Sequence, residues 1–302
     1  MMQQMTTSVP RMTYGLADCA MLTASDLARV SNLTERDQTD VIAFLSARPV
    51  HTVVMTSFIN DNGLENELNR GKFYGYRGAK GELEGVALIG HSTLIEARSD
   101  EALRAFALKA RNAETPIHLI MSSGNGAEAF WQYMTDGLTK PRLSCTEALF
   151  EVSFPFPVQK PDLEIRNADM SHLMAVAEAQ AEVAFIESGV DPMLRDREGF
   201  LKRVARRIEQ KRVFIATDGD KLIFKADIIA ETDEVAYLEG VFVDPAFRGH
   251  GIGSKCLAGL TLQLMSRFSN ICLLSNVELT SAHRSFEKAG FRRSDQCTTL
   301  FV

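Results

Sequence analysis

Hydrophobic and polar positions divide the second half of the chain into alternating strands and helices. Apolar runs at 213–216 and 222–229 flank Asp218-Gly219, a residue pair typical of a hairpin turn. The run 235–243 is apolar on both faces and predicts a central strand. Leucines recur at helical spacing within 251–268. The other expected elements are strand 163–166, a helix from Asp169 or Ser171 to 186, helix 198–211, strand 271–274, helix 281–289 and strand 298–302.

The first half repeats much of this order. We expect helices at 34–47, 100–109 and 127–134, and strands at 72–76, 83–95, 117–122 and 145–154. Residues 133–138 also echo residues 286–291. The pattern predicts an α+β layered fold with two tandem domains, each a mixed, mostly antiparallel sheet flanked by helices. We interpret the first as a degenerate copy of the second. Two unrelated α+β domains are the alternative.

The predicted domain boundary is the proline-rich segment around Pro155, Pro157 and Pro161, because proline cannot continue a helix or a central strand. The expected division is a disordered lead-in at 1–20, a domain at 21–154, a linker at 155–162 and a domain at 163–302.

Composition narrows the class of protein. A net charge of −6 disfavours nucleic acid and anionic membranes as partners. The 5 cysteines show no CxxC spacing, which predicts no metal site and a reducing, cytoplasmic location. No apolar run is long enough to cross a bilayer, and the N-terminus does not resemble a signal peptide.

A glycine-rich turn follows the predicted strand 235–243. The chain reads Val243-Asp244-Pro245-Ala246-Phe247-Arg248-Gly249-His250-Gly251-Ile252-Gly253-Ser254, and an amphipathic helix begins inside the glycines. Glycines let an anion approach the backbone, and the amide groups at a helix N-terminus attract it. Arg248 adds a formal charge. The segment therefore predicts a diphosphate-binding loop.

Two known classes of phosphate-binding loop do not fit this segment. Walker A requires Gly-Lys-Ser/Thr, whereas Gly253 is followed by Ser254-Lys255. A dinucleotide-binding loop would have glycine or alanine in place of Ser254 and an acidic residue near Asn270, and the chain has neither.

The loop resembles motif A of the GNAT acetyltransferases, where Arg/Gln-x-x-Gly-x-Gly/Ala holds the pyrophosphate of acetyl-CoA. Downstream, Ala282-His283-Arg284-Ser285-Phe286-Glu287-Lys288-Ala289-Gly290-Phe291 resembles the family's Ala-x-x-x-Tyr-x-Lys-x-Gly-Phe segment. Residues 189–192, 224–226 and 298–301 extend the resemblance to a bacterial subgroup in which a GNAT domain follows a GNAT-like N-terminal domain.

This resemblance implies an acyltransferase that uses acetyl-CoA, and it assigns roles to residues. Backbone groups of Val241, Phe242 and Val243 would line the pantetheine arm and polarise the thioester carbonyl. Phe286 would pack against the acetyl or sulfur end. The diphosphate would be held by Arg248, Gly249, His250, Gly251, Ile252, Gly253 and Ser254.

The chain departs from the family at two positions. Phe286 replaces the usual tyrosine and cannot protonate the leaving thiolate. The family's common asparagine is Leu279 here, but Asn276 lies one pleat earlier and is included among the cofactor contacts. Acid catalysis contributes about 10²–10⁴-fold, so its loss slows transfer without abolishing it.

Glu239 is the candidate general base. By alternation it shares a strand face with Val235, Tyr237, Val241 and Val243, where a carboxylate is costly unless it is used or paired. The alternative is an ion pair with Lys225 on the neighbouring strand.

Other charged residues carry weaker hypotheses. Glu182, Glu187 and Asp191 suit an acidic mouth for a cationic acceptor, although a solvated face is the simpler interpretation. The basic helix 197–211 is interpreted as surface, with the 3′-phosphate of CoA as its alternative ligand. His250 and His283 are expected to lie on the surface rather than to react.

The first half lacks the loop. Its third strand leads into Ile95-Glu96-Ala97-Arg98-Ser99-Asp100, which offers no glycine turn. Gly124-Asn125-Gly126 is interpreted as a plain strand-to-helix turn. The expected roles of this half are scaffold, dimer contact or part of the acceptor site, and a homodimer stays open.

The leading functional hypothesis is transfer of an acyl group from CoA to a primary amine, carried by a small molecule or a peptide, through direct attack on the thioester. The alternative is a CoA-binding regulatory or scaffolding protein without activity, which the departures at Phe286 and Leu279 favour.

Overall fold

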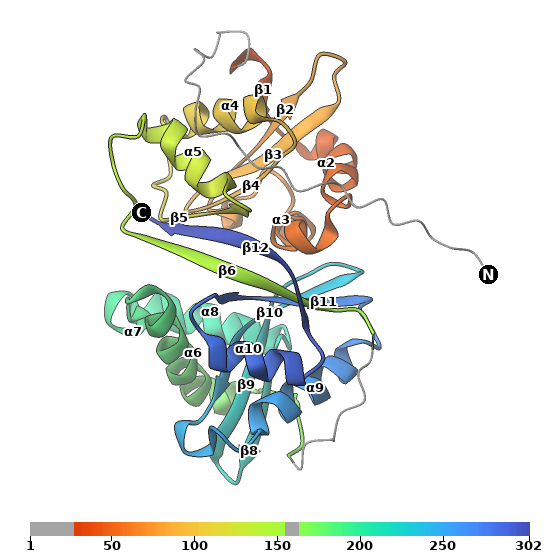
Figure 1. Ribbon diagram of the computed structural model, residues 1–302, viewed down its shortest axis with the longest axis vertical. Helices are drawn as coiled ribbons and strands as arrows, with labels where there is room; N and C mark the ends of the chain where they lie inside the picture. Colours follow the sequence, from red (N-terminus) through yellow and green to blue (C-terminus); the bar gives the residue numbers. More distant parts are fainter. Residues whose placement is uncertain (1–26, 155–162) are drawn as a thin grey trace, which may run out of the picture. The chain divides into compact units, whose positions relative to one another are not determined.

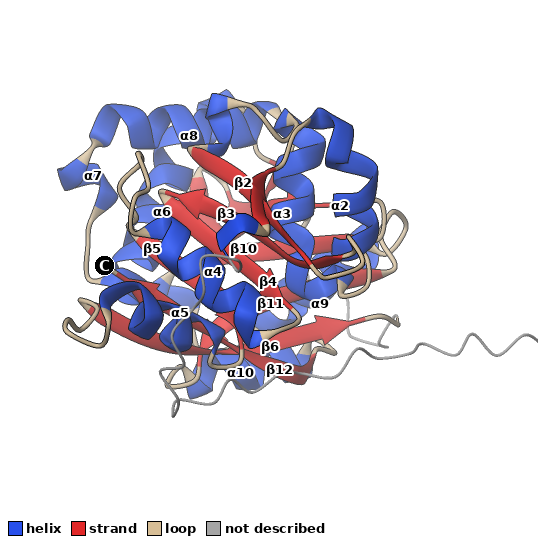
Figure 2. Ribbon diagram, turned by 90° about the horizontal axis from the view of Figure 1, so that it is seen from above, coloured by secondary structure: helices blue, strands red, loops and turns tan. Residues whose placement is uncertain are grey.

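A computed structural model describes residues 27–154 and 163–302 of the chain. The expected lead-in at 1–20 and linker at 155–162 lie outside the described residues. The chain forms two compact units, drawn with their strands and helices in Figure 1 and Figure 2. One unit comprises residues 1–147 and 296–302, and the other comprises residues 148–295.

The first unit is a sheet in the order β1-β2-β3-β4-β5-β12. Helices α4 and α5 pack on one face of the sheet, and α2 and α3 pack on the other. Pairing is antiparallel except between β4 and β5, which are parallel. Its elements are β1 (Val30–Asn32), η1 (Glu35–Asp37), α2 (Gln38–Leu45), α3 (Pro49–Asn62), η2 (Glu67–Asn69), β2 (Gly71–Arg77), β3 (Leu83–Gly90), β4 (Ser92–Ala97), α4 (Asp100–Ala110), β5 (Leu119–Ser123), α5 (Gly126–Thr135) and most of β12 (Arg292–Phe301).

The second unit has the same order of elements, with a sheet β7-β8-β9-β10-β11-β6. Helices α9 and α10 cover one face of the sheet, and α6 and α8 cover the other. Strands β10 and β11 are parallel, like β4 and β5. The elements are the second half of β6 (Leu143–Val152), β7 (Arg166–Asn167), η3 (Met170–His172), α6 (Leu173–Ser188), α7 (Pro192–Arg195), α8 (Arg197–Glu209), β8 (Val213–Asp218), β9 (Lys221–Glu231), β10 (Val235–Val243), η4 (Pro245–Phe247), α9 (Ile252–Leu264), β11 (Asn270–Asn276) and α10 (Thr280–Lys288).

The repeated order confirms the predicted duplication. The division into units differs from a cut at the proline-rich segment in two places. Residues 148–152 of β6 belong to the second unit, and residues 296–301 of β12 belong to the first. Each half of the chain therefore gives its last strand to the sheet formed mainly by the other half.

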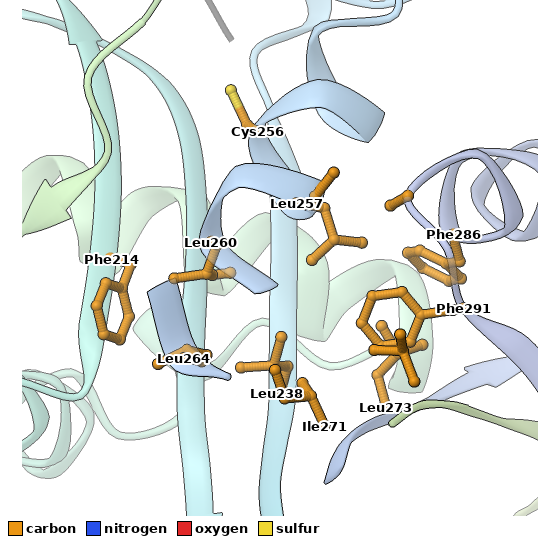
Figure 3. Close-up of a cluster of buried hydrophobic side chains, with 14 of the residues drawn as sticks. Phe214, Leu238, Cys256, Leu257, Leu260, Leu264, Ile271, Leu273, Phe286 and Phe291 are labelled. Atoms are coloured by element: carbon orange, nitrogen blue, oxygen red, sulfur yellow. The ribbon is translucent and has the colours of Figure 1, made fainter. Parts of the chain in front are cut away.

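A hydrophobic core between the sheet and α9 holds this helix against the second unit's sheet. Leu257, Leu260 and Leu264 of α9 face Leu238 of β10, as Figure 3 shows. Phe150 and Val152 of β6 complete this core, and each is at least nine-tenths buried.

The sequence pattern did not predict helices α3 and α7, strand β1 or the short 3-10 helices η2 and η4, and it merged two strands into one. Helix α3 follows the predicted helix 34–47 after a short break and begins with Pro49 in its first turn. The expected strand 83–95 is two strands, β3 and β4, separated at His91. Strand β1 and the short helix α7 were also not predicted.

Leu300 tests the exchange of strands. Its side chain is 1% exposed and packs in the core of the first unit, between the sheet and helices α4 and α5. Leu300→Ala should cost about 2–5 kcal/mol, because it leaves a cavity in that core. Hydrogen exchange followed by mass spectrometry should show faster exchange in β4 and β5.

Leu257→Ala in the second unit is the matched control, and it should accelerate exchange in β10 and β11 instead. If Leu300→Ala mainly affected β10 and β11, the assignment of β12 to the first unit would be wrong.

Candidate active site

The glycine-rich loop presents backbone amides to open space. Gly249 and Gly251 adopt φ of +82° and +76°, and no atom lies within 4 Å of a Cβ built on Gly249. Within the described chain, the amide groups of residues 249–254 donate no hydrogen bond to another residue, whereas the amide of Lys255 bonds the Gly251 carbonyl. Such a row of unsatisfied amides at a helix N-terminus is an anion-binding arrangement.

Gly253 has a different role. A Cβ on this residue would lie 2.9 Å from Cγ2 of Val243, so its glycine lets α9 approach the end of β10. Ser254 is buried, and its hydroxyl donates to the Gly251 carbonyl at 2.9 Å. Both residues therefore shape the loop from beneath. His250 is exposed, and Ile252 packs on the core.

The first unit supplies a natural comparison for this helix N-terminus. Helix α4, which occupies the equivalent position, is capped by the hydroxyl of Ser99 and has Asp100 and Glu101 in its first turn. Helix α9 has Gly251 as its N-cap, without a side-chain cap and without an acidic residue in the first turn. Because acidic residues neutralise the positive end of a helix, only α9 is left ready for an anion.

Arg248 joins the loop to its surroundings. Its Nε donates to the Val243 carbonyl at 2.8 Å, and its guanidinium lies 2.9 Å from Oε1 of Glu182 on α6. Both side chains are about half exposed, so this ion pair is weak and open to replacement by a competing anion. Glu182, for which a solvated face was the simpler interpretation and an acceptor mouth the other, is paired with Arg248 and still about half exposed.

Strands β10 and β11 stop pairing with each other before β10 reaches the loop. Their parallel pairing runs from Val235↔Asn270 to Leu238↔Leu273 and ends there, although β10 continues to Val243. In the described chain, the edge of β10 that faces β11 thus has no strand partner from Glu239 onward. An extended ligand can hydrogen-bond such an edge as a strand does.

A β-bulge interrupts β10 immediately after Glu239. Gly240 adopts φ of +61°, and the pairing with β9 shifts between Glu239↔Asp227 and Phe242↔Lys225. The bulge inserts a residue and inverts the alternation of side chains. Phe242 packs beneath α6 and α8 as a result, whereas Val241 and Val243 pack on the α9 side.

The prediction that Glu239 shares a face with Val241 and Val243 was therefore wrong. Strict alternation holds only for an unbroken strand, and the extra residue at Gly240 moves both valines to the opposite face.

A polar cluster lies buried under α6 and α8, on the same face as Glu239. Lys225 and Asp227 of β9 are 0% and 1% exposed, and Nζ lies 2.9 Å from Oδ1. Arg207 of α8 lies 3.5 Å from the other carboxylate oxygen. Gln180 of α6 accepts a short hydrogen bond from Lys225. The sequence offered one signal for this cluster, because Lys225 and Asp227 stand inside an otherwise apolar strand.

Glu239 is directly opposite Asp227 and accepts no hydrogen bond from any described residue. The expected alternative, an ion pair with Lys225, is not formed, since Lys225 pairs with Asp227. Burial raises the pKa of Glu239, the nearby Arg207 and Lys225 lower it, and Asp227 raises it; the net direction is upward. A carboxyl group with a raised pKa accepts a proton more readily.

The first unit has a glutamate in the equivalent position. Glu96 is the first residue of β4 after its parallel pairing with β5 ends, as Glu239 is in β10. Arg48 holds both oxygens of Glu96 at 3.1 Å and also donates to Ser123. The same position is thus neutralised in one unit and left without a hydrogen-bond donor in the other.

The downstream residues have packing and capping contacts. Phe286 is 7% exposed and meets Phe150 of β6 edge-on, with ring centroids 5.5 Å apart. Oδ1 of Asn276 accepts from the amide of Glu278, so this side chain closes the turn after β11. His283 is hydrogen-bonded to the Asn276 carbonyl at 3.0 Å, and its ring contacts that of Phe150 at a tilted angle, with centroids 4.9 Å apart. It is therefore an anchored residue rather than a free surface histidine.

Within residues 27–154 and 163–302, no helix is both long and apolar enough to cross a bilayer. In the same residues, no group of His, Cys, Asp and Glu is arranged to hold a metal ion.

Comparison with known proteins agrees with this geometry. Residues 209–293 match the family model described as the acetyltransferase (GNAT) domain, so the C-terminal part of the chain is a GNAT acetyltransferase domain. No curated protein matches the chain.

Solved structures show that the fold extends over both units. The chain is similar to a GCN5-related N-acetyltransferase from Sphaerobacter thermophilus, with 13% identity, a TM-score of 0.56, and coverage of 90% of this chain and 94% of the other. It is similar to a tandem GNAT protein from the clavulanic acid biosynthesis pathway, with 12% identity, a TM-score of 0.55, and coverage of 90% and 97%. A Drosophila protein gives a TM-score of 0.65 at 12% identity, with coverage of 91% and 98%. The fold is that of tandem GNAT proteins.

Gly240 offers a test of the bulge through stability. Its positive φ strains any other residue by about 1–2 kcal/mol. An added Cβ would also approach Gln180 Oε1 and Lys225 Nζ, which are hydrogen-bonded in the cluster. Displacing them should cost about 1–3 kcal/mol more. Gly240→Ala should therefore lower the free energy of unfolding by about 2–5 kcal/mol in urea titration.

Gly219→Ala is the matched control. Gly219 has φ of +56° in the β8–β9 hairpin, with no atom within 4 Å of an added Cβ, so only the backbone strain should remain. Equal losses for the two variants would show that the cluster does not occupy the space beside Gly240.

Proposed function

We propose that this protein is an acyl-CoA-dependent N-acyltransferase that transfers an acetyl group from acetyl-CoA to a primary amine. One observation carries the proposal. Strand β10 has no strand partner on its β11 side from Glu239 onward in the described chain, and the loop after it leads to the N-terminus of α9, which has no side-chain cap and has the unsatisfied amides of residues 249–254. A diphosphate matches the helix N-terminus, and an extended arm attached to the diphosphate matches the unpaired edge of β10.

The residues divide the work of binding. The amides of Gly249 and Gly251 would hold the diphosphate, and Arg248 would exchange Glu182 for a phosphate oxygen. The free edge of β10 at Val241 to Val243 would bind the pantetheine amides and polarise the thioester carbonyl. When bound, acetyl-CoA supplies the acyl thioester.

Glu239 would act as the general base. The amine forms a bond to the carbonyl carbon while the carbon–sulfur bond breaks, and the proton of the amine passes to the Glu239 carboxylate directly or through water. The CoA thiolate leaves and takes a proton from solvent, because Phe286 has no proton to give. Thiols have pKa values near 8.5, so the thiolate leaves without an acid.

Direct transfer agrees with the state of the cysteine nearest to the loop in sequence. Cys256 is fully buried in α9, and burial raises its pKa to about 11. It remains a thiol at neutral pH and is unsuited to carry the acyl group.

A second candidate function is a CoA-binding regulator without catalysis. The burial of Phe286 against Phe150 favours it, because this residue then supports the core rather than the reaction. Release of thiol from acetyl-CoA over a panel of amines separates the two functions. Tight CoA binding without release on any amine would identify the regulator.

The partner in this proposal is an amine on a small molecule or a peptide. The net charge of −6 favours a cationic acceptor over nucleic acid or an anionic membrane. We expect the reaction in the cytoplasm, where its acyl donor is available.

Side chains at Gly249 and Gly251 should block the diphosphate. Each alanine would place a methyl group in the open space before α9, while the fold bears only backbone strain. The double variant should raise the Kd for acetyl-CoA at least about tenfold in isothermal titration, equivalent to about 1.4 kcal/mol. Gly219→Ala, strained but remote in the hairpin, should leave the Kd unchanged. Unaltered affinity in the double variant would remove the basis for this site.

Glu239→Gln should lower kcat by about 10²–10⁴-fold and leave the Kd for acetyl-CoA unchanged. Since the base must be deprotonated and burial raises its pKa, wild-type kcat should rise with pH above the usual carboxyl range near 4.3. That limb should disappear from the pH profile of Glu239→Gln.

Glu96→Gln is the matched control for this experiment, because Glu96 holds the same strand position in the other unit. It should keep the rise of kcat with pH even if it destabilises the fold by removing the charge that Arg48 contacts. Retention of the limb in Glu239→Gln would mean that another group accepts the proton.

A further inference from the structure

The Lys225 ammonium occupies an unusual place for a cation. It is completely buried in a strand of the central sheet, where an unpaired charge would be prohibitively costly. Burial lowers its pKa, and Asp227 opposes that effect. A hydrophobic residue of similar volume would fill the same space without desolvating a charge. We therefore expect Lys225 to have a role that needs its charge and its hydrogen-bond donors, which an apolar side chain lacks.

The contacts of Lys225 converge on the bulge. Nζ donates to the Gly240 carbonyl at 3.2 Å, to Gln180 Oε1, and pairs with Asp227 at 2.9 Å. The bulge carbonyl is thus bonded to a cation that is itself held from α6 and from β9. Gly240 in turn has no Cβ, which leaves the space that Nζ and Gln180 occupy.

The bulge separates the two functional parts of β10. Glu239 precedes it and stays on the face of the polar cluster, and the backbone of Val241 to Val243 follows it. A carbonyl fixed at Gly240 therefore sets the distance and orientation between the base and the strand edge that would bind the acyl donor.

We propose that Lys225 is a positioning residue for acyl transfer, which holds the Gly240 bulge and thereby orients Glu239 relative to the free edge of β10. This inference rests on the proposed function. Three charged groups face Glu239 from the elements packed against it, namely Lys225 and Asp227 on β9 and Arg207 on α8. Lys225 supplies one of the two positive charges in this set.

Lys225→Met tests the proposal, because it keeps the volume and removes the cation. We expect kcat with an amine acceptor at pH 7 to fall at least about tenfold, as expected for loss of orientation at the reacting groups. The pH limb of kcat should move to higher pH, since removing a cation favours the protonated carboxyl. The Kd for acetyl-CoA should change by less than about threefold, because the loop at 249–254 does not contact Lys225.

A double-variant cycle separates positioning from stability. In a Glu239→Gln background, Lys225→Met has no carboxylate to orient, so the added loss in kcat should be much smaller than in the wild type. Equal losses in both backgrounds would overturn the positioning role and leave the assignment of Glu239 intact. Absence of transfer by the wild-type protein on every amine would instead refute the proposed function.

Gln180→Met is the milder variant if Lys225→Met does not fold. It removes one hydrogen-bond acceptor of Nζ and keeps all charges. It should lower kcat by a smaller factor with the same unchanged Kd. If this variant lost stability but kept the wild-type kcat and pH profile, the proposal would also be contradicted.

Discussion

The structure of the site depends on one irregularity, the residue inserted into β10 at Gly240. A regular strand there would keep Glu239, Val241 and Val243 on a single face of the sheet. The insertion leaves the carboxylate beneath α6 and α8 and turns the valines toward α9. The proposed base and the proposed donor-binding edge are then adjacent in sequence but lie on different sides of the strand. A glycine with positive φ and a buried ammonium maintain this arrangement.

The duplicated unit shows which features are general to the fold and which belong to the site. Both units end a parallel strand pair at a glutamate, so this position is a property of the architecture. In the first unit Arg48 neutralises the glutamate and Ser99 caps the following helix. In the described part of the second unit, no hydrogen-bond donor reaches Glu239 and no side chain caps α9. The anion-binding helix end that we propose is thus a feature of the second unit and not of the first.

Much of the second unit was predictable because its signals are local. The bounds 235–243 were predicted as they occur, and the hairpin lies where it was expected, although Asp218 pairs with Lys221 and the two turn residues are Gly219 and Asp220. The glycine loop and the start of α9 follow from residues that are adjacent in sequence. The features that escaped depend on tertiary context. Helix α3 contains many β-branched residues and lacks a clear helical period, so packing rather than propensity makes it helical.

The polar cluster escaped for a related reason. The sequence suggested Glu239, on the neighbouring strand, as the ion-pair partner of Lys225. Its actual partners come from α6, β9 and the bulge carbonyl, which no local pattern relates. The contacts of Asn276 and Phe286 likewise depend on the turn after β11 and on a strand from the other half of the chain.

The placement of β6 and β12 bears on the origin of the chain. A single ancestral repeat whose last strand completed the sheet of a second, identical repeat would have been a domain-swapped dimer. Fusing the two copies would make that exchange intramolecular and independent of protein concentration. The N-terminal half is then needed by the C-terminal half even without a reaction of its own, because it encodes Phe150 and Val152, which lie in the core of the second unit. Genetic loss of either repeat would remove a strand from the sheet of the survivor.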